Sequence, residues 1–367
     1  CFFINTVEAV NLATPTEYDV PKDAGDSSIR YPRGIAFNND GTRMFVSGLD
    51  LNQQGIRQFD LSVGFDLSST ITPGSKVGKT AGDVTNEKIA NPYSIRFNND
   101  GTKLFFLQGV STTLREFTLS TAFDITSVSA AGSSDTVDYT LTDSGNSSGF
   151  AFNSDGTKLF VADLPNHQID VYSLSVGFDL DSTISYQSSQ SLDISAETES
   201  PRSVIFSRDG TTMFVLQKTH VDEYVLTTGY DLTTAKYVDS DANNHTQPWA
   251  IELNRCSSCD GRELFLAVNG GNKISQHLLP AAYNLSTPTV TFSPADNATN
   301  VALDANIVLT FSEDMDVEEG NITIKKTSGD TTVETIDVTS GQVTGTGTTT
   351  ITINPSSDLE ENTEYYV

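Results

Sequence analysis

The chain has 367 residues, 37% of them hydrophobic, which is enough apolar material for globular cores, so wholesale disorder is excluded. Its 48 acidic and 21 basic side chains give a net charge of −27. Such a surface repels phosphate backbones and anionic lipids, so we expect no nucleic-acid binding, and apolar runs such as Leu264 to Val268 are too short for membrane insertion.

The N-terminus begins at Cys1 and lacks the charged and apolar segments of a secretion signal. We therefore expect a mature secreted protein or a fragment, and in either case part of a longer multidomain chain. Cys1 also has the position of the lipid-bearing cysteine of a mature lipoprotein, although Phe2 and Phe3 are unusual neighbours for that role.

A phrase of the type YPRGIAFNNDGTRMFV recurs five times along the first three quarters of the chain. Its Asp-Gly pairs recur about 51 to 60 residues apart, a period typical of stacked structural repeats. An Asp-Gly pair between two short runs of alternating apolar residues is the strongest local signal for a β-hairpin, because glycine tolerates the positive φ of the turn. The aspartates of the five pairs are Asp40, Asp100, Asp155, Asp209 and Asp260.

Each hairpin is followed by a second shared phrase, such as IRQFDLSVGFDL or IDVYSLSVGFDL, which predicts a third strand. A more variable outer strand completes each unit, and a four-stranded antiparallel unit repeated at this period is a β-propeller blade. We expect these outer strands at residues 16–20, 72–80, 135–141, 185–194 and 235–241.

The order of the strands predicts how the ring closes. The first outer strand, TEYDV at 16–20, precedes the first hairpin. No outer strand follows the third strand of the fifth repeat, at about 273–279. The N-terminal strand therefore completes the last blade as a latch, which removes open sheet edges. We predict an all-β, five-bladed β-propeller over residues 1–286; a six-bladed ring that has lost a blade at the N-terminus remains an alternative.

The blade phrase Pro-x-Gly-Ile-Ala-Phe-Asn-x-Asp-Gly-Thr-Lys-Leu-Phe-Val resembles the repeats of YVTN/NHL-type bacterial surface propellers. The resemblance covers the whole propeller segment and implies architecture. It implies little about activity, because such propellers serve as binding platforms and in some cases as enzymes.

The composition changes at residues 287–367, where the alternating runs VTF, IVLTF, NITIKK, TTVETIDV and TTTITI predict about six strands of a C-terminal Ig-like β-sandwich. The sequence SPADNATNVALDANIVLTFSEDMD resembles bacterial Ig-like domains of S-layer proteins, adhesins and other surface proteins. Family members usually carry one further strand after the final Tyr-Tyr-Val, so we expect a copy truncated at its C-terminus. The domain is strongly acidic, as a solvated spacer would be.

One register at the entry to the first strand of each blade varies between copies, although its flanks are nearly constant. The five side chains should ring one mouth of the central channel, where aromatic faces and guanidinium groups suit sugar rings or carboxylates. A ligand-binding mouth and a tolerant loop edge both fit this variation. The residues are Arg33, Tyr93, Ser148, Arg202 and Trp249, the last being the only tryptophan.

Two groupings suggest a crosslink and a cation. Cys256 and Cys259 lie in the fifth Asp-Gly hairpin; no second pair follows at zinc-finger spacing, so we predict a local disulfide. In the second domain Asp314, Asp316 and Glu318 place carboxylates at alternate positions, which suits Ca²⁺, although an EF-hand loop is missing. No other cofactor is expected.

Catalytic groupings are absent from the sequence. We interpret the Asp-Gly carboxylates as turn chemistry because they recur too regularly for a site. Glu252 is the only acid within a first strand, and Arg96 is the only base at the corresponding position. A lone carboxylate is not a glycosidase pair, so an ion-pair role or a channel-plugging role is favoured. His167, His220 and His245 fall in loops of one face, where a cluster is geometrically feasible.

These observations favour a non-enzymatic, extracellular or cell-surface binding or adhesion protein, with a propeller head on an acidic Ig-like stalk and a glycan or surface protein as its ligand. Two alternatives stay open: a propeller hydrolase that acts on a glycan or lactone, and a structural repeat component of an envelope layer or viral fibre.

Overall fold

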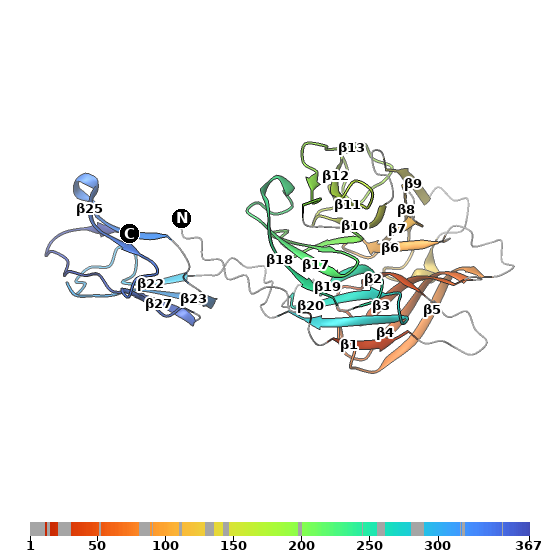
Figure 1. Cartoon of the computed structure of the whole chain (residues 1–367), viewed down its shortest axis with the longest axis horizontal. Coiled ribbons are helices and arrows are strands. Elements are labelled where there is room, and N and C mark those ends of the chain that lie inside the picture. Colours follow the sequence, from red (N-terminus) through yellow and green to blue (C-terminus); the bar gives the residue numbers. More distant parts are fainter. Residues whose placement is uncertain are drawn as a thin grey trace. The chain divides into compact units, whose positions relative to one another are not determined.

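The computed structural model describes residues 12, 15–20, 31–50, 53–80, 89, 91–109, 112–128, 136–141, 147–196, 200–243, 245–254, 261–279, 290–315, 317, 320–346 and 348–367. The chain divides into two compact units, one of residues Ala9–Leu285 and one that contains Ser286–Val367 (Figure 1). None of the described residues forms a helix long and apolar enough to cross a membrane.

The first unit is a five-bladed β-propeller, as the repeats predict (Figure 1). The inner strands β2, β6, β10, β15 and β19 follow one another around the ring, and β19 returns to β2. Blade 1 is β2 (Pro32–Phe37), β3 (Arg43–Asp50), β4 (Gln53–Leu61) and β5 (Ile71–Thr80); blade 2 is β6 (Pro92–Phe97), β7 (Lys103–Gln108), β8 (Thr113–Thr118) and β9 (Thr136–Thr140), with a 3₁₀ turn at Ile125–Ser127.

The remaining blades repeat this order. Blade 3 is β10 (Ser147–Phe152), β11 (Lys158–Asp163), β12 (Gln168–Leu174), β13 (Ile184–Tyr186) and β14 (Leu192–Asp193); blade 4 is β15 (Ser203–Phe206), β16 (Thr212–Leu216), β17 (His220–Leu226) and β18 (Ala235–Ala242), with a 3₁₀ turn at Leu232–Thr234. Blade 5 is β19 (Pro248–Leu253), β20 (Glu263–Val268), β21 (Lys273–Leu278) and β1 (Thr16–Asp19).

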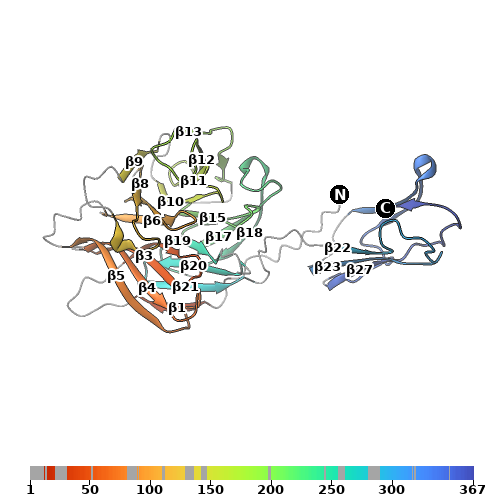
Figure 2. The ribbon, with the colours of Figure 1, turned by 180° about the vertical axis from the view of Figure 1, so that it is seen from behind.

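The N-terminal strand closes the ring as predicted. β1 pairs with β21 in antiparallel register, so that Glu17 lies opposite Ser275 and Tyr18 opposite Ile274, and Figure 2 shows the two strands side by side. Val20 follows β1 and is almost completely buried in the core between blades 5 and 1. The latch therefore adds both backbone pairing and apolar burial to the last blade.

The outer strand of blade 3 differs from the sequence prediction. Residues 185–194 were expected to form one strand, but β13 and β14 are two short strands that both pair with β12 and flank a turn. The backbone amide of Val171 in β12 donates to the hydroxyl of Ser191 in that turn, 3.1 Å away. The backbone amide of Gln187 donates to the Val171 carbonyl. A side chain thus replaces a strand backbone as the partner of β12.

The two repeated phrases contact each other within every complete copy. Phe123 has a positive φ of 54°, and its amide donates to the carbonyl of Gly101 over 2.9 Å. A Cβ on Gly101, itself at φ +73°, would lie 2.3 Å from the Phe123 ring. This position therefore requires glycine for two reasons: the turn has a positive φ, and the aromatic ring leaves no room for a Cβ. The equivalent pairs are Gly41 with Phe65, Gly156 with Phe178 and Gly210 with Tyr230.

Contacts between blades also follow the repeat. The Lys103 ammonium of blade 2 donates to the carbonyl of Phe178 in blade 3 over 2.8 Å, and Lys158 of blade 3 reaches Tyr230 of blade 4 over 3.0 Å. Aromatic rings pack across the same boundaries, with centroids 4.5 Å apart for Phe160 and Phe206. In blades 1 to 3 the basic residue after the turn thus links its blade to the next.

The second unit is a sandwich of two antiparallel sheets around a core that includes Ile322, Ile324 and Ile351. Its described residues form seven strands, where the alternating runs predict about six, because the two-residue strands β26 and β28 are too short to show alternation. One sheet has the order β22 (Val290–Ser293), β23 (Ile307–Met315), β27 (Thr348–Ile353), β26 (Val343–Thr344); the other is β25 (Thr331–Asp337), β24 (Asn321–Lys326), β28 (Tyr365–Tyr366), with a 3₁₀ turn at Ser328–Asp330.

Candidate functional site at the two ends of the propeller channel

The inner strands begin at one end of the channel, which we call the mouth, and four of the five residues singled out there touch one another. The Arg33 guanidinium lies 3.9 Å from the Trp249 ring centroid and 4.8 Å from that of Tyr93. Arg202 approaches the same indole at 4.5 Å, and Tyr93 meets it edge-on at 5.7 Å. Residues from blades 1, 2, 4 and 5 therefore form one Arg-aromatic stack.

The fifth residue, Ser148, has no exposed surface and is not part of the stack. Its hydroxyl donates to the carbonyl of Arg202 over 2.7 Å. The Arg202 guanidinium in turn donates to the carbonyl of Pro248, also over 2.7 Å. Ser148 thus supports the chain that carries Arg202, which is itself anchored to blade 5.

The stack carries positive charge and unused hydrogen-bond donors. Nε and Nη1 of Arg33, Nε of Arg202 and Nε1 of Trp249 are buried and have no partner among the described residues. Within the same part of the chain neither guanidinium has an ion-pair partner, and burial lowers the pKa of Arg33. Burial and, secondarily, the nearby Arg33 charge lower the pKa of Arg202. A bound anion would stabilise the charged form of both guanidinium groups and offset their burial and mutual repulsion.

Further buried polar atoms without a partner lie at the same end. Ser94 and Ser203 follow the mouth residues of blades 2 and 4, and Asp163 ends β11 opposite Ser147. Folded proteins leave few buried polar atoms unpaired, so each such atom requires an explanation, and their concentration at one end indicates a site for a polar ligand. The atoms are Ser94 Oγ, Asp163 Oδ1, His167 Nδ1, Ser203 Oγ and Asn243 Nδ2.

An ion pair joins the two charged inner-strand residues, which confirms the ion-pair interpretation of Glu252 and Arg96. Arg96 Nη1 lies 3.2 Å from Glu252 Oε2, and both side chains are buried. Arg96 also donates to the carbonyls of Ile35 and Ile251 over 3.0 and 2.9 Å. These contacts therefore join blades 1, 2 and 5 at the axis of the propeller.

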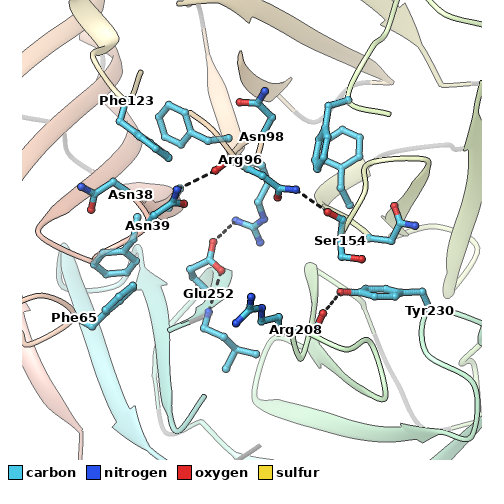
Figure 3. A pocket seen from close by; sticks show the side chains of 18 residues that line it. Asn38, Asn39, Phe65, Arg96, Asn98, Phe123, Ser154, Arg208, Tyr230 and Glu252 are labelled. Carbon is cyan, nitrogen blue, oxygen red and sulfur yellow. Dashed lines mark hydrogen bonds and ion pairs between the residues drawn. The ribbon is translucent and has the colours of Figure 1, made fainter. Parts of the chain in front are cut away.

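The other end of the channel is a cavity of about 480 Å³, which we call the cup (Figure 3). Arg96 and Glu252 form part of its floor. On its rim Asn39 Nδ2 donates to the carbonyl of Asn99 over 2.9 Å, and Asn99 Nδ2 donates to that of Ser154 over 2.7 Å. Its aromatic lining consists of Phe37, Phe65, Phe97, Phe123, Phe152, Phe178 and Tyr230.

The sequence reasoning missed the cup. Its rim residues precede the Asp of each Asp-Gly pair, and only the regularity of the aspartates was considered. The sequence feature that indicates the cup is the variation at the position directly before each turn aspartate. In blades 1 to 4 this position is occupied by Asn39, Asn99, Ser154 and Arg208. Arg208 is exposed and points into the cup (Figure 3).

The turn aspartates have the structural role expected of them. Asp40 Oδ1 accepts hydrogen bonds from the amide and hydroxyl of Thr42, at 3.0 and 2.6 Å. These bonds lower the pKa of the Asp40 carboxyl. Asp100 and Asp155 repeat the same arrangement with their own threonines. Their carboxylates therefore hold the hairpins rather than a ligand.

The contact that the structure shows for His245 is with His277 of β21, a residue outside the three loop histidines considered from the sequence. The Nε2 atoms of His245 and His277 are 3.2 Å apart, and the Ser275 hydroxyl lies 2.8 Å from the first and 2.6 Å from the second. His277 Nδ1 lies 3.2 Å from the carbonyl of Leu12, in the N-terminal segment. Burial, with His245 adding to it, lowers the pKa of His277 to about 4.

Two sequence predictions lie outside the described residues. Cys256 and Cys259 belong to a segment that the structure does not describe, and so do Asp316 and Glu318; of Asp314 only the backbone is described. Among the residues that are described, no group of three or more His, Cys, Asp or Glu side chains could hold a metal ion.

The comparisons bear mainly on the second unit. Residues 286–367 match the family model of the bacterial Ig-like domain. This confirms the resemblance of the C-terminal sequence. No curated protein matches the chain.

Solved structures that the chain resembles include a functionally unknown protein from Desulfotomaculum acetoxidans, with 15% identity, 71% of each chain covered and a TM-score of 0.42. Another is the periplasmic gluconolactonase of Pseudomonas aeruginosa, with 11% identity, 92% of this chain and 73% of that chain covered, and a TM-score of 0.40. Likeness at this level says nothing about activity.

Proposed function

We propose that the protein is an extracytoplasmic, non-enzymatic binding protein whose propeller recognises a surface glycan at the mouth of its channel. The match of residues 286–367 to bacterial Ig-like domains supports a location outside the cytoplasm. The observation that carries the proposal is the set of buried, unpartnered polar atoms around the stack of Arg33, Trp249 and Arg202.

The charge of the stack favours a ligand with a carboxylate. Guanidinium groups bind carboxylates with charge-assisted hydrogen bonds, and neither Arg33 nor Arg202 has an acidic partner among the described residues. The hydroxyls of Ser94 and Ser203 can serve sugar hydroxyls, which both donate and accept. With a net charge of −27 the chain repels polyanions, so a terminal acidic sugar suits the mouth better than a highly charged polymer.

The indole has a different role from the open stacking platform that its sequence position suggests. Guanidinium groups already lie over the Trp249 ring, at 3.9 and 4.5 Å from its centroid. The indole therefore positions the two arginines for the ligand, and its Nε1 offers one further donor. Binding rather than hydrolysis is favoured because Glu252, the acid of the inner strands, is neutralised by Arg96.

A glycan array on the purified chain, followed by titration of the best ligand, tests the proposal. We expect acid-terminated glycans to bind and their carboxyl-reduced forms to bind much more weakly. Trp249 is the only tryptophan, so its fluorescence reports occupancy of the mouth directly. Arg33→Met should weaken binding about tenfold or more, since a hydrogen bond to a charged group contributes roughly 1.5–3 kcal/mol.

Arg208→Met is the control, because Arg208 is also an arginine of the channel but is exposed and lines the opposite end. It should leave the affinity for the acid-terminated glycan unchanged. An array without hits, or a ligand whose affinity survives Arg33→Met and whose addition leaves the Trp249 emission unmoved, would refute the proposed function.

A further inference from the structure

We propose that the cup is a second binding site, separate from the mouth, and that it takes a neutral saccharide of one or two rings. The two ends lie at different levels of the inner strands, because the buried Arg96–Glu252 pair lies between the mouth residue Tyr93 and the rim residue Asn99 of blade 2. The pair is fixed to backbone carbonyls of blades 1 and 5.

The size and walls of the cup suit a sugar ring. Its volume of about 480 Å³ falls within the range of roughly 300–1,000 Å³ of small-molecule sites. Seven aromatic side chains line it, together with amides and charged groups, so apolar and polar surface are interleaved. Saccharides have the same character, with C–H faces that pack on aromatic rings and hydroxyls that require hydrogen-bond partners.

The rim is pre-organised for hydroxyl groups. Asn39 and Asn99 each use their Nδ2 to bond the neighbouring blade, which orients the side chains before any ligand arrives. Their Oδ1 atoms have no partner among the described residues and remain as acceptors. Ser154 adds a hydroxyl, and Arg208 adds guanidinium donors that no acid engages in the described part of the chain. The rim thus offers acceptors from blades 1 and 2 and donors from blades 3 and 4, and vicinal hydroxyls can use both.

The local charge argues for a neutral rather than an acidic sugar. Arg96 and Glu252 neutralise each other on the floor, which leaves Arg208 as one unpaired cation in the cup. Each rim residue is followed in the sequence by a turn aspartate, and hydrogen bonds from threonine lower the pKa of Asp40 and Asp100, so these carboxylates stay ionised. The rim, with one arginine beside several turn aspartates, is therefore less attractive to an anion than the mouth, where Arg33 and Arg202 both contact Trp249.

The experiment uses the whole chain and a panel of glucose, galactose, mannose, N-acetylglucosamine and their β-linked disaccharides. Saturation-transfer NMR identifies the binders, and calorimetric titration gives their affinities. Ser154→Trp places a large side chain in the cup at an exposed position that varies between blades, and it should abolish binding. Ser154→Ala, the size control, should retain it within about threefold, and Arg208→Ala should weaken it fivefold or more.

The mouth variant Arg33→Met completes a double dissociation. It should leave the affinity of the neutral sugar unchanged, and Ser154→Trp should leave the affinity of the acid-terminated glycan unchanged. The proposal is overturned if no sugar of the panel saturates below about 10 mM, which corresponds to under 3 kcal/mol of binding, or if Ser154→Trp leaves the affinity intact while the thermal melt shows an intact fold. Loss of neutral-sugar binding in Arg33→Met alone would move that sugar to the mouth and leave the cup without a role.

Discussion

Mild acid should weaken the propeller through the histidine that joins the N-terminal latch to blade 5. His277 is buried, with His245, Ser275 and the Leu12 carbonyl around it. Since Nδ1–H donates to the Leu12 carbonyl, Nε2 is the acceptor of the Ser275 hydroxyl, and this arrangement requires a neutral ring. Protonation of Nε2 would turn this atom into a donor, so that it could no longer accept the hydrogen bond from the Ser275 hydroxyl.

The direction and size of the effect follow from the lowered pKa. The pKa of His277 falls from 6.5 to about 4 on folding, so between these values the unfolded chain binds a proton that the folded chain refuses. The stability is complete above pH 6.5, declines as the pH falls, and reaches its full loss below about pH 4. With about 1.4 kcal/mol per pKa unit, the loss is roughly 2.5 kcal/mol at pH 4.5 and about 3 kcal/mol at the limit.

The neighbouring charges act in both directions. Burial lowers the pKa of His245 as well, which adds to the loss of stability in acid, and Glu17 opposes this. The ammonium of Lys273, which pairs with Glu17, remains charged because that contact raises its pKa. Hydrogen bonds from threonine lower the pKa values of Asp40, Asp100 and Asp155 below 3.8, so these carboxyls titrate at lower pH than the two histidines. We therefore assign the loss of stability between about pH 6.5 and 4.5 to His277 and His245.

Urea unfolding followed by Trp249 fluorescence measures the free energy of unfolding at several pH values from about 7.5 to 4.5. The wild-type protein should lose roughly 2 to 3 kcal/mol over this range. His277→Gln keeps a donor for the Leu12 carbonyl and an acceptor for Ser275 but cannot titrate, so most of the slope should disappear. A flat wild-type profile, or the same slope in His277→Gln, would refute the reasoning.

Three further predictions concern the propeller. Gly101→Ala should destabilise the propeller by roughly 2–4 kcal/mol, because φ is +73° and the new Cβ would lie 2.3 Å from the Phe123 ring. Gly271→Ala, at φ +112° with its nearest neighbour 3.7 Å away, should cost clearly less in chemical denaturation. Equal costs for the two variants would contradict the contact between Gly101 and the ring. Arg96→Met should cost about 3–5 kcal/mol because it removes the cation that pairs with the buried Glu252 carboxylate, and the double change with Glu252→Leu should recover most of it. Additive losses in the denaturation curves would contradict the ion pair. Deletion of residues 1–20 removes the strand that pairs with β21, so calorimetry should show a lost or broadened propeller transition, and an unchanged one would exclude the latch.

The parts of the fold that could be predicted from the sequence are those whose signals are local. Each hairpin is specified by one Asp-Gly pair between alternating apolar runs, and each signal repeats, so the blades and their number followed directly. The latch also followed, because counting strands is sufficient to place TEYDV. The outer strand of blade 3 could not be predicted, since Ser191 and Gln187 satisfy β12 through contacts that no periodicity shows.

The candidate site was predictable only as a register. The shared position in the repeat predicts that Arg33, Tyr93, Arg202 and Trp249 lie at one end of the channel. It does not predict that the guanidinium groups cover the indole ring. Ser148 shares the register and is nevertheless buried under Arg202, because side chains of different length reach different depths at the axis. The meeting of His245 with His277 depends on where the N-terminal segment lies, which is a tertiary property.

The repeat itself explains why functional groups lie where its copies disagree. In blades 1 to 3 the residue after the turn (Arg43, Lys103 or Lys158) meets the same partner, a backbone carbonyl of the next blade, so a basic residue satisfies all three copies. At the axis the five copies meet one another, and five identical charges within a few ångströms would repel by several kcal/mol. Charge on the axis therefore requires that the copies differ, as Arg96 and Glu252 do where they pair. Variation at an axial register is thus a physical requirement for a polar site in a propeller, and it locates both the mouth and the cup in this chain.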